Sequence, residues 1–388
     1  MLLTYPCVTR AEAVAFSIAL LVAASPASAG ALLQVGPQHE LKTPSEAAKV
    51  ARDGDTIEIE PGLYPGNAAV WPQHRLTIRG RGGRAHLRAD GAHAEGKAIW
   101  VIKGSETIIE SLEFSGAKVP DHNGAAIRLE GPGLTIRNCY IHHNENGILT
   151  GQSLESDILI EHSEFAYNGF GDGQTHNIYI GKVRSFTLRS SYVHHAVVGH
   201  NVKSRAVKSY ITYNRIMDEA DGRSSYAIDL PNGGLSFVIG NLIQQGPAND
   251  NRTIVAYGAE GYNNPLNELY FVNNTVVNDD PRGGRFFLVR RGAHAVRVVN
   301  NVFSGLGELT VQDGELRANQ RTQSHQFVGA AMFDYRPKPG SPAIGRGVDP
   351  GNAYGVALLP SAEYQHPLQT RARSTSGPLD LGALEYRR

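Results

Sequence analysis

The sequence predicts an all-β protein folded as a parallel β-solenoid, and three observations lead to this fold class. Apolar runs of three to five residues alternate with polar residues at a period of two, whereas amphipathic helices need longer runs with a period near 3.6. The runs recur in phrases that lie 23 to 33 residues apart. Each phrase holds a small or polar residue, most often Asn, at the same place. A repeat of this length with several short strands is typical of one solenoid coil.

The repeated phrases place one side chain per coil at an equivalent bend. Asn suits this bend because it tolerates a left-handed backbone and because stacked amides can hydrogen-bond from coil to coil. We therefore predict an internal ladder of these side chains, and we expect Cys139, which occupies one of the ladder positions, to have a packing role. The phrases are LTIRNCYI, ILIEHSEF, FTLRSSYV, YITYNRIM, FVIGNLIQ, YFVNNTVV and VRVVNNVF, with an earlier copy in IIESLEF. The ladder positions are Leu112 in that earlier copy, then Cys139, Ser163, Ser191, Asn214, Asn241, Asn274 and Asn301.

The order of elements along the chain predicts three segments. Residues 1–29 have the features of a secretory signal peptide, with cleavage expected after Ala29, which predicts a periplasmic or secreted protein. Residues 30–305 are expected to form the solenoid. A short capping helix is expected to begin at Thr43 or Ser45 and to end at Asp53-Gly54, before a first strand in TIEIE. Residues 306–388 are loop-rich and are expected to pack on the solenoid.

Composition excludes some classes of function. The formal net charge of the 388-residue chain is zero, which does not favour a nucleic-acid partner. No stretch after the signal is apolar enough to predict a membrane span. Of the two Cys residues, Cys7 lies in the predicted signal, so Cys139 has no intrachain partner. We expect a monomer.

Three features resemble the right-handed parallel β-helix superfamily of pectate lyases and their relatives, in particular exported bacterial β-helix repeat proteins. They are the entry AAKVARDGDTIEIEPGLY, the Asn ladder, and the closing phrases DYRPKPGSPAIGRG and LDLGALEY. The resemblance implies an acidic polysaccharide as partner. It does not select one subfamily, because the Arg-centred pectate lyase signature, the multi-Asp set of polygalacturonases and the Asp-Pro-His-Asp phrase of alginate epimerases are not evident.

Alternation within the strands predicts a row of outward side chains. THNIYIG and GHNVKSR repeat a His-Asn pair and then differ, with Tyr179 in the first and Lys203 in the second. Counting alternate residues outward also places Asn177 and Asn201 on the outer face. Coils about 4.8 Å apart would stack these side chains closely. The predicted row is Arg128, Leu149, Tyr179, Lys203, Asp229 and Ala256.

This row favours β-elimination on a uronate-containing glycan. The reaction needs a base, an acid for the leaving oxygen, and a group that neutralises the carboxylate. Lys203 is the expected base, with Tyr179, His176 or His200 as acid and Arg205 as a further catalytic residue. The expected substrate-binding residues are Arg128, Asn177, Asn201, Asp229, Tyr226 and Tyr257.

A metal ion is an open alternative for the neutralising role. The resemblance implies Ca²⁺, because several lyases of this fold combine a Lys or Arg base with that ion. Asp229 and Asp172 are the expected ligands, although no spacing matches a known calcium loop. The pairs His142-His143 and His194-His195 are a weaker metal signal, since no carboxylate lies at ligand spacing beside them in the sequence.

Two other functions fit the same residues. A glycoside hydrolase would use Asp229 with a second carboxylate, Asp221 or Glu260, across one glycosidic bond. A non-catalytic glycan-binding or surface polysaccharide protein would use the long solenoid face without cutting the chain. A purely structural interpretation also remains, in which Lys203 and Asp229 form an ordinary exposed cross-strand ion pair. In the same interpretation His176 and His200 form a stacked loop ladder.

Overall fold

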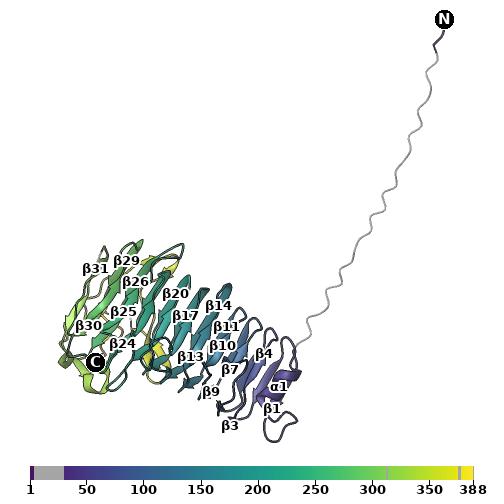
Figure 1. Ribbon diagram of the computed structural model, residues 1–388. Helices are drawn as coiled ribbons and strands as arrows, with labels where there is room; N and C mark the ends of the chain where they lie inside the picture. The colour runs from purple at the N-terminus through teal and green to yellow at the C-terminus, as the bar shows by residue number, and fades with distance from the viewer. Residues whose placement is uncertain (4–29, 312, 375–376, 388) are drawn as a thin grey trace.

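The computed structural model describes residues 1–3, 30–311, 313–374 and 377–387, and it confirms the predicted parallel β-solenoid. Coils stack from the end that carries α1 to the end that carries β31, and each coil contributes one strand to up to three parallel sheets (Figure 1). The predicted signal peptide at residues 1–29 lies almost wholly outside the described residues. Within the described residues, no helix has both the length and the apolar character to cross a membrane.

The first sheet, sheet A, has twelve strands in stacking order. They are β1 (Leu32–Val35), β2 (Thr56–Ile59), β5 (Thr77–Gly80), β8 (Thr107–Glu110), β11 (Leu134–Arg137), β14 (Ser153–Glu161), β17 (Val183–Arg189), β20 (Lys208–Thr212), β23 (Leu235–Ile239), β26 (Glu268–Val272), β29 (Ala295–Val299) and β31 (Glu315–Arg317). The TIEIE segment forms β2 rather than the first strand, because β1 already pairs with it from before the helix.

Sheet B has eleven strands and follows sheet A in each coil. They are β3 (Gly62–Pro65), β6 (Ala85–Arg88), β9 (Leu112–Ser115), β12 (Tyr140–His142), β15 (Glu164–Ala166), β18 (Tyr192–His194), β21 (Arg215–Met217), β24 (Leu242–Gln245), β27 (Thr275–Asn278), β30 (Val302–Gly305) and β32 (Gln320–Thr322). Strands β31 and β32 continue sheets A and B, so the stack extends beyond the predicted boundary at residue 305.

Sheet C has nine strands and carries the predicted outward row. They are β4 (Ala69–Trp71), β7 (Ala98–Ile102), β10 (Ala125–Leu129), β13 (Asn146–Thr150), β16 (Ile178–Ile180), β19 (Val202–Ser204), β22 (Ile228–Leu230), β25 (Thr253–Tyr257) and β28 (Arg285–Val289). One continuous apolar core fills the space between the sheets, with Trp71, Trp100 and Phe114 in edge-to-face contact near the N-terminal end.

The N-terminal end of the stack is capped by one helix, as predicted. Helix α1 (Pro44–Val50) begins after Thr43, whose hydroxyl accepts a hydrogen bond from the backbone N–H of Glu46 at 3.4 Å. Ala47 and Ala48 are buried against the first coils. The helix therefore covers apolar surface and sheet edges that an open first coil would expose.

The predicted ladder runs between sheets A and B. The backbone N–H of Asn241 donates to Asn274 Oδ1 at 2.9 Å, and the side-chain amide of Asn241 donates to the same oxygen at 2.9 Å. Equivalent bonds begin at Cys139 and extend to Asn319, one coil beyond the predicted end. The left-handed residue is the one before each ladder position, such as Asn273 with φ 50°, rather than the ladder Asn itself. The ladder Asn is thus selected for its amide, not for its backbone.

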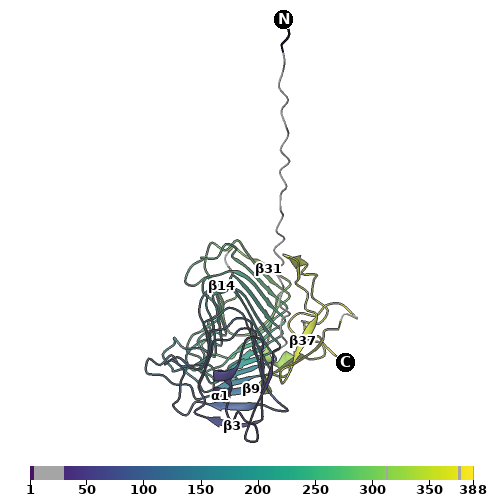
Figure 2. The ribbon, with the colours of Figure 1, turned by 90° about the vertical axis from the view of Figure 1, so that its right-hand side faces the viewer.

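The segment after β32 runs back along the stack. It contains η1 (Ser324–Gln326), β33 (Phe327–Gly329), η2 (Ala330–Met332), β34 (Asp334–Pro337), β35 (Asn352–Ala353), β36 (Val356–Ala357), β37 (Ala362–Gln365) and β38 (Gln369–Ala372). Strand β37 lies beside the solenoid in the view turned by 90° (Figure 2). A hydrogen bond of 2.8 Å joins His162 Nδ1 to the carbonyl of Leu368, and Leu381 and Ala383 pack with Val277 and Val302.

Candidate active site

The outward row of sheet C forms as alternation predicts. Strand register pairs Arg128 with Leu149, then Tyr179, Lys203, Asp229 and Ala256 on successive coils. A parallel solenoid holds this register because a slip by one residue would turn the apolar side chains of a strand out of the core. The backbone of sheet C therefore repeats from coil to coil, while the side chain at this outward position differs in each coil.

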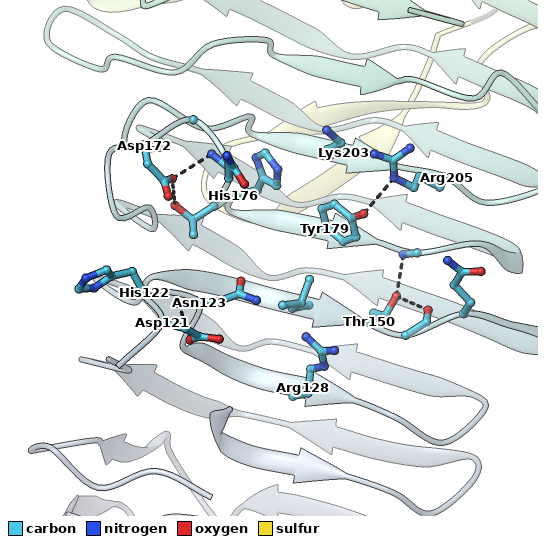
Figure 3. A pocket seen from close by; sticks show the side chains of 17 residues that line it. Asp121, His122, Asn123, Arg128, Thr150, Asp172, His176, Tyr179, Lys203 and Arg205 are labelled. Atoms are coloured by element: carbon cyan, nitrogen blue, oxygen red, sulfur yellow. Dashed lines mark hydrogen bonds between the residues drawn. The ribbon is translucent and has the colours of Figure 1, made fainter. Parts of the chain in front are cut away.

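A cleft of about 760 Å³ lies over the N-terminal half of this row. Figure 3 shows Arg128, Tyr179, Lys203 and Arg205 projecting along one side of successive strands, with the loops that carry Asp121 and Asp172 on the opposite side. The cleft is lined by residues 121–123, Arg128, residues 149–152, residues 172–176, Tyr179, Gly181, Lys203 and Arg205. Asp229 and Glu260 lie behind Lys203 rather than in this lining.

Lys203 joins the cleft to two carboxylates behind it. Its Nζ lies 3.4 Å from Asp229 Oδ2 and 3.5 Å from Glu260 Oε1, and its side chain is 11% exposed. The same nitrogen lies 5.9 Å from the centre of the Tyr179 ring. The interpretation of Lys203 and Asp229 as an ordinary exposed pair is wrong in one respect, because the Asp229 side chain is only 3% exposed.

Asp229 is held in an environment that disfavours its charge. One carboxylate oxygen, Oδ1, is buried without a hydrogen-bond partner among the described residues. The other lies 3.4 Å from both His200 Nε2 and Lys203 Nζ. Burial raises the pKa of Asp229 to about 6, although the neighbouring Lys203 lowers it. Asp229 can therefore change its protonation state near neutral pH.

Arg205 connects Tyr179 to Glu260. Its Nε donates to Tyr179 Oη at 2.9 Å, while Nη1 donates to Glu260 Oε2 at 2.6 Å and Nη2 to Glu260 Oε1 at 3.0 Å. Nη1 also donates to Asn232 Oδ1. These hydrogen bonds from Arg205 lower the pKa of Glu260. Because the phenol oxygen already accepts from Arg205, its own proton is left to be donated elsewhere.

His176 and His200 form a stacked pair beside this row. Their ring centres are 4.6 Å apart, and the backbone N–H of His200 donates to His176 Nδ1 at 3.0 Å. The backbone N–H of Tyr226 donates in the same way to His200 Nδ1 at 3.3 Å. Each Nδ1 is thus an acceptor, which leaves the proton of a neutral ring on Nε2. Burial lowers the pKa of His200 to about 3 and that of His176 well below its usual value.

Arg128 differs from the other cationic side chains of the cleft. Among the described residues it makes no ion pair, and its buried Nε has no hydrogen-bond partner. Its place in the row is two coils before Tyr179, at a spacing of about 10 Å. An arginine with unused donors in a cleft is a suitable receptor for a carboxylate.

The predicted outward orientation of Asn177 and Asn201 is wrong. Both are fully buried, and Asn177 Nδ2 donates to Asn201 Oδ1 at 2.8 Å. Asn168 donates to Asn177 Oδ1, so these amides form a second internal ladder. Alternation fails here because both residues precede the strands, at bends that direct the side chains inward. Neither lines the cleft.

The two predicted aromatic binding residues have different positions. Tyr257 is fully buried in the core, with its hydroxyl donating to the carbonyl of Gly234 at 2.6 Å, so its expected place in the cleft wall is wrong. It pairs in register with the inward Leu230. Tyr226 is half-buried and packs its ring 4.7 Å from that of His200, at the end of the His stack.

The two predicted calcium ligands have separate surroundings. Asp172 lines the cleft, where its Oδ1 accepts from the backbone N–H of Gln174 at 2.9 Å. Asp229 instead faces two nitrogen-bearing side chains. Among the described residues, the one group of three His, Cys or carboxylate side chains with converging ligand atoms lies elsewhere, on sheet B.

Sequence reasoning missed several residues of this region. Asn232 binds Arg205 but has no signal in the sequence, and the same is true of the loop at 121–123 in the cleft wall. The sequence suggests Glu260 only as a hydrolase carboxylate, whereas it binds both Lys203 and Arg205. All of these lie in loops between strands, whose paths the repeat does not determine.

The fold and the cleft together define a right-handed parallel β-helix with a row of phenol, ammonium and guanidinium groups over sheet C. The chain is similar in structure to the pectate lyase Pel9A, with a TM-score of 0.66 and 15% identity over 93% of this chain and 97% of that chain. At this identity the likeness establishes the fold alone.

Two further solved structures match over part of their length. The ORF18 protein of Geobacillus virus E2 matches with a TM-score of 0.45 and 10% identity, over 69% of this chain and 53% of that chain. A mutant of the PL6-family alginate lyase AlyGC matches with a TM-score of 0.29 and 12% identity, over 76% and 53%. No protein-family model matches the sequence, and no curated protein matches it significantly.

Proposed function

We propose that this protein is an exported polysaccharide lyase that cleaves a uronate-containing glycan by β-elimination. The observation that carries the proposal is the cleft itself, in which Lys203 and Tyr179 lie on adjacent coils, with Arg128 in the same row and without an ion-pair partner in the described part of the chain. Pectate lyase Pel9A has the same fold, which makes a glycan-cleaving β-helix chemically reasonable without assigning a substrate.

Lys203 is proposed as the base that takes the proton next to the uronate carboxylate. An amine can do this only after it loses its own extra proton. Asp229 is placed to accept that proton, because its Oδ2 is 3.4 Å from Lys203 Nζ and its pKa is raised to about 6 by burial. A substrate that covers the cleft would remove water and favour the uncharged forms of both groups.

Tyr179 is proposed as the acid that protonates the leaving oxygen. Its hydroxyl lies in the cleft lining with its own proton not used by Arg205. After the transfer, the Arg205 guanidinium would remain within hydrogen-bond distance of the phenolate and stabilise it. In this scheme His176 and His200 hold neutral rings behind the acid and base, and their role is to position them.

Two groups are proposed to bind and neutralise the carboxylates of the substrate. Arg128 would bind the carboxylate of a sugar two coils away from Tyr179, since Arg205 is already bound to Glu260. The carboxylate at the reacting sugar would be neutralised by Ca²⁺ held at Asp172, because Lys203 must be uncharged to act as the base. The assay with Ca²⁺ and with a chelator tests this assignment separately from the roles of Lys203 and Tyr179.

The test is an assay for new double bonds. The protein is incubated with a panel of acidic polysaccharides, with Ca²⁺ or with a chelator, and ultraviolet absorbance of unsaturated uronate ends is followed. A rise with one polymer that is lost in K203A and kept in K208A supports the proposal. Lys208 is a matched control because it lies in the same coil, on sheet A, with an exposed side chain. No rise with any polymer would contradict it.

A second candidate function rests on the two carboxylates behind Lys203. Asp229 and Glu260 each approach the same nitrogen, so the two contacting oxygens lie at most about 7 Å apart, an upper limit that overlaps the range of about 5 to 9.5 Å that glycoside hydrolases use. Their pKa values are shifted in opposite directions, upward for Asp229 and downward for Glu260. The burial of Asp229 behind the cleft makes this the weaker candidate. New reducing ends without new double bonds would favour it.

A glycan-binding protein without activity is the remaining alternative. It predicts that a polymer binds to the cleft and keeps its length. Loss of that binding in R128A would locate the binding face, and unchanged polymer length after long incubation would exclude both enzymatic proposals for that polymer.

We also propose that the protein is a monomer and that residues 1–29 direct its export. N-terminal sequencing of the secreted chain would test the expected cleavage after Ala29.

A further inference from the structure

Three metal-ligand side chains converge on sheet B, away from the cleft on sheet C. They are His86 on β6, Glu113 on β9 and His142 on β12, from three successive coils. One ligand atom from each lies within 4.8 Å of the other two, and no other group of three in the described part of the chain meets this condition. The residues take no part in the chemistry proposed for the cleft.

The distances fit the edges of a small coordination polyhedron. His86 Nδ1 is 3.3 Å from Glu113 Oε1, and His142 Nε2 is 3.1 Å from the same oxygen. A tetrahedral Zn²⁺ ion with bonds of about 2.0–2.1 Å separates its ligand atoms by about 3.3–3.4 Å. Two of the three edges are therefore already at the required length.

Outer hydrogen bonds orient both imidazoles toward the centre. His86 Nε2 is 2.7 Å from Ser115 Oγ, and His142 Nδ1 is 2.7 Å from His143 Nδ1. If these outer nitrogens carry the protons, the lone pairs of His86 Nδ1 and His142 Nε2 face Glu113. Metal-binding histidines usually donate the outer N–H to a hydrogen-bond acceptor, and Ser115 Oγ and His143 Nδ1 can accept here.

We propose that His86, Glu113 and His142 bind Zn²⁺ or a similar divalent transition-metal ion. Two imidazoles and one carboxylate are ligands that such ions accept, and three protein ligands leave a fourth position for water. The side chains are 25%, 26% and 14% exposed, so the ion and the water can enter from solvent. The site is separate from the proposed lyase cleft, and its occupancy does not depend on lyase activity.

The same sheet contains a near copy of the site that lacks one ligand. Two coils further on, His194 Nε2 is 3.3 Å from Glu164 Oε1, and His194 Nδ1 is 2.7 Å from His195 Nδ1. The register His86–Glu113–Tyr140–Glu164 places Tyr140 where the third ligand would be. The copy thus repeats the His–Glu pair and its outer bond but offers only two ligands.

The experiment measures metal binding by the full chain after treatment with a chelator. Zn²⁺ is titrated by calorimetry, and Co²⁺ is added separately to follow the visible absorbance of a tetrahedral ion. We expect one tight site per chain. H86A, E113Q and H142A should each weaken Zn²⁺ binding by more than about 100-fold, and S115A by about 10- to 100-fold. Circular dichroism checks that each variant is folded.

H194A is the matched control, because His194 has the same carboxylate and histidine neighbours. It should leave the affinity and the stoichiometry unchanged. Y140H should add a second site by completing the near copy. The proposal is overturned if the wild-type chain binds no stoichiometric Zn²⁺, if binding survives in E113Q and H142A, or if H194A weakens it as much as H142A does.

Discussion

Asp229 Oδ2 lies 3.4 Å from Lys203 Nζ in a pocket where the carboxylate is almost fully buried. The strand register places the two residues side by side on adjacent coils, and His200 and Glu260 enclose them. The pair therefore combines a proton donor with an acceptor whose pKa burial raises to about 6. Its charge state decides both the stability of this coil and the proposed reaction.

The first prediction concerns stability and pH. The pKa of Asp229 is higher in the folded protein, about 6, than the usual value of 3.8, so the folded state binds the proton more tightly. Its contribution to stability is fully present below about pH 4 and is lost as pH rises to about 6. The free energy of unfolding of wild type relative to D229N should fall by roughly 3 kcal/mol over this window.

Chemical denaturation at a series of pH values measures this difference. The comparison with D229N matters because His200 changes the free energy of unfolding with pH in the opposite direction. Its pKa is lowered to about 3 in the folded protein, so it adds stability as pH rises from about 3 toward 6.5. That term is present in both proteins, so the comparison removes the part of it that does not depend on the Asp229 carboxylate, whose Oδ2 lies 3.4 Å from His200 Nε2. A difference that stays constant, or that rises with pH, would show that Asp229 is ionised throughout.

The second prediction concerns the proposed acid. Y179F removes the hydroxyl that accepts from Arg205 Nε and should lower kcat by about 10²-fold or more, with little change in KM. Steady-state kinetics on the polymer identified by the absorbance assay measures both constants. Y210F is the control, because Tyr210 is a half-buried tyrosine stacked on Phe237 of sheet A. Equal losses in the two variants would remove Tyr179 from the mechanism.

The sequence was sufficient for the fold and for the register of sheet C. Repeat spacing indicates a solenoid, and alternation in strands of three to five residues gives the row from Arg128 to Asp229, because burial of the apolar face permits only one register. Alternation was misleading where no strand exists, as at Asn177 and Asn201. In TIVAY the alternation that places Ala256 in the outward row places Tyr257 inward, so the expectation that Tyr257 lines the cleft did not follow the alternation, and the structure buries this side chain.

The enclosure of the site could not be predicted in the same way. Glu260 and Asn232 reach Arg205 from loops, and their positions depend on tertiary packing rather than on the repeat. The group on sheet B was missed for a different reason, although His142 was noted as a weak metal signal. Its partners His86 and Glu113 lie on the two preceding coils, and only the register of the sheet B strands brings the three side chains together.

The third prediction concerns Arg128. R128A should raise KM by about 10- to 100-fold with little change in kcat, because the side chain would bind a carboxylate away from the bond that breaks. R184A is the control, since Arg184 is an exposed arginine that is already paired with Asp157. A large fall in kcat without a change in KM would instead place Arg128 at the reacting sugar.

The last prediction concerns the ladder that holds the coils together. The Asn241 side chain accepts from Asn214 and donates to Asn274 and to the carbonyl of Ile211, all in the core. N241A leaves these groups without partners and should lower the free energy of unfolding by about 2 to 4 kcal/mol. N241S should lower the free energy of unfolding by less, because Ser163 and Ser191 show that a hydroxyl can accept the bond from the preceding coil.

Denaturant unfolding measures the free energy of unfolding of both variants. N263A, at an exposed Asn, is the control and is expected within about 0.5 kcal/mol of wild type. If N241A were as stable as N263A, the ladder would contribute packing rather than hydrogen-bond energy.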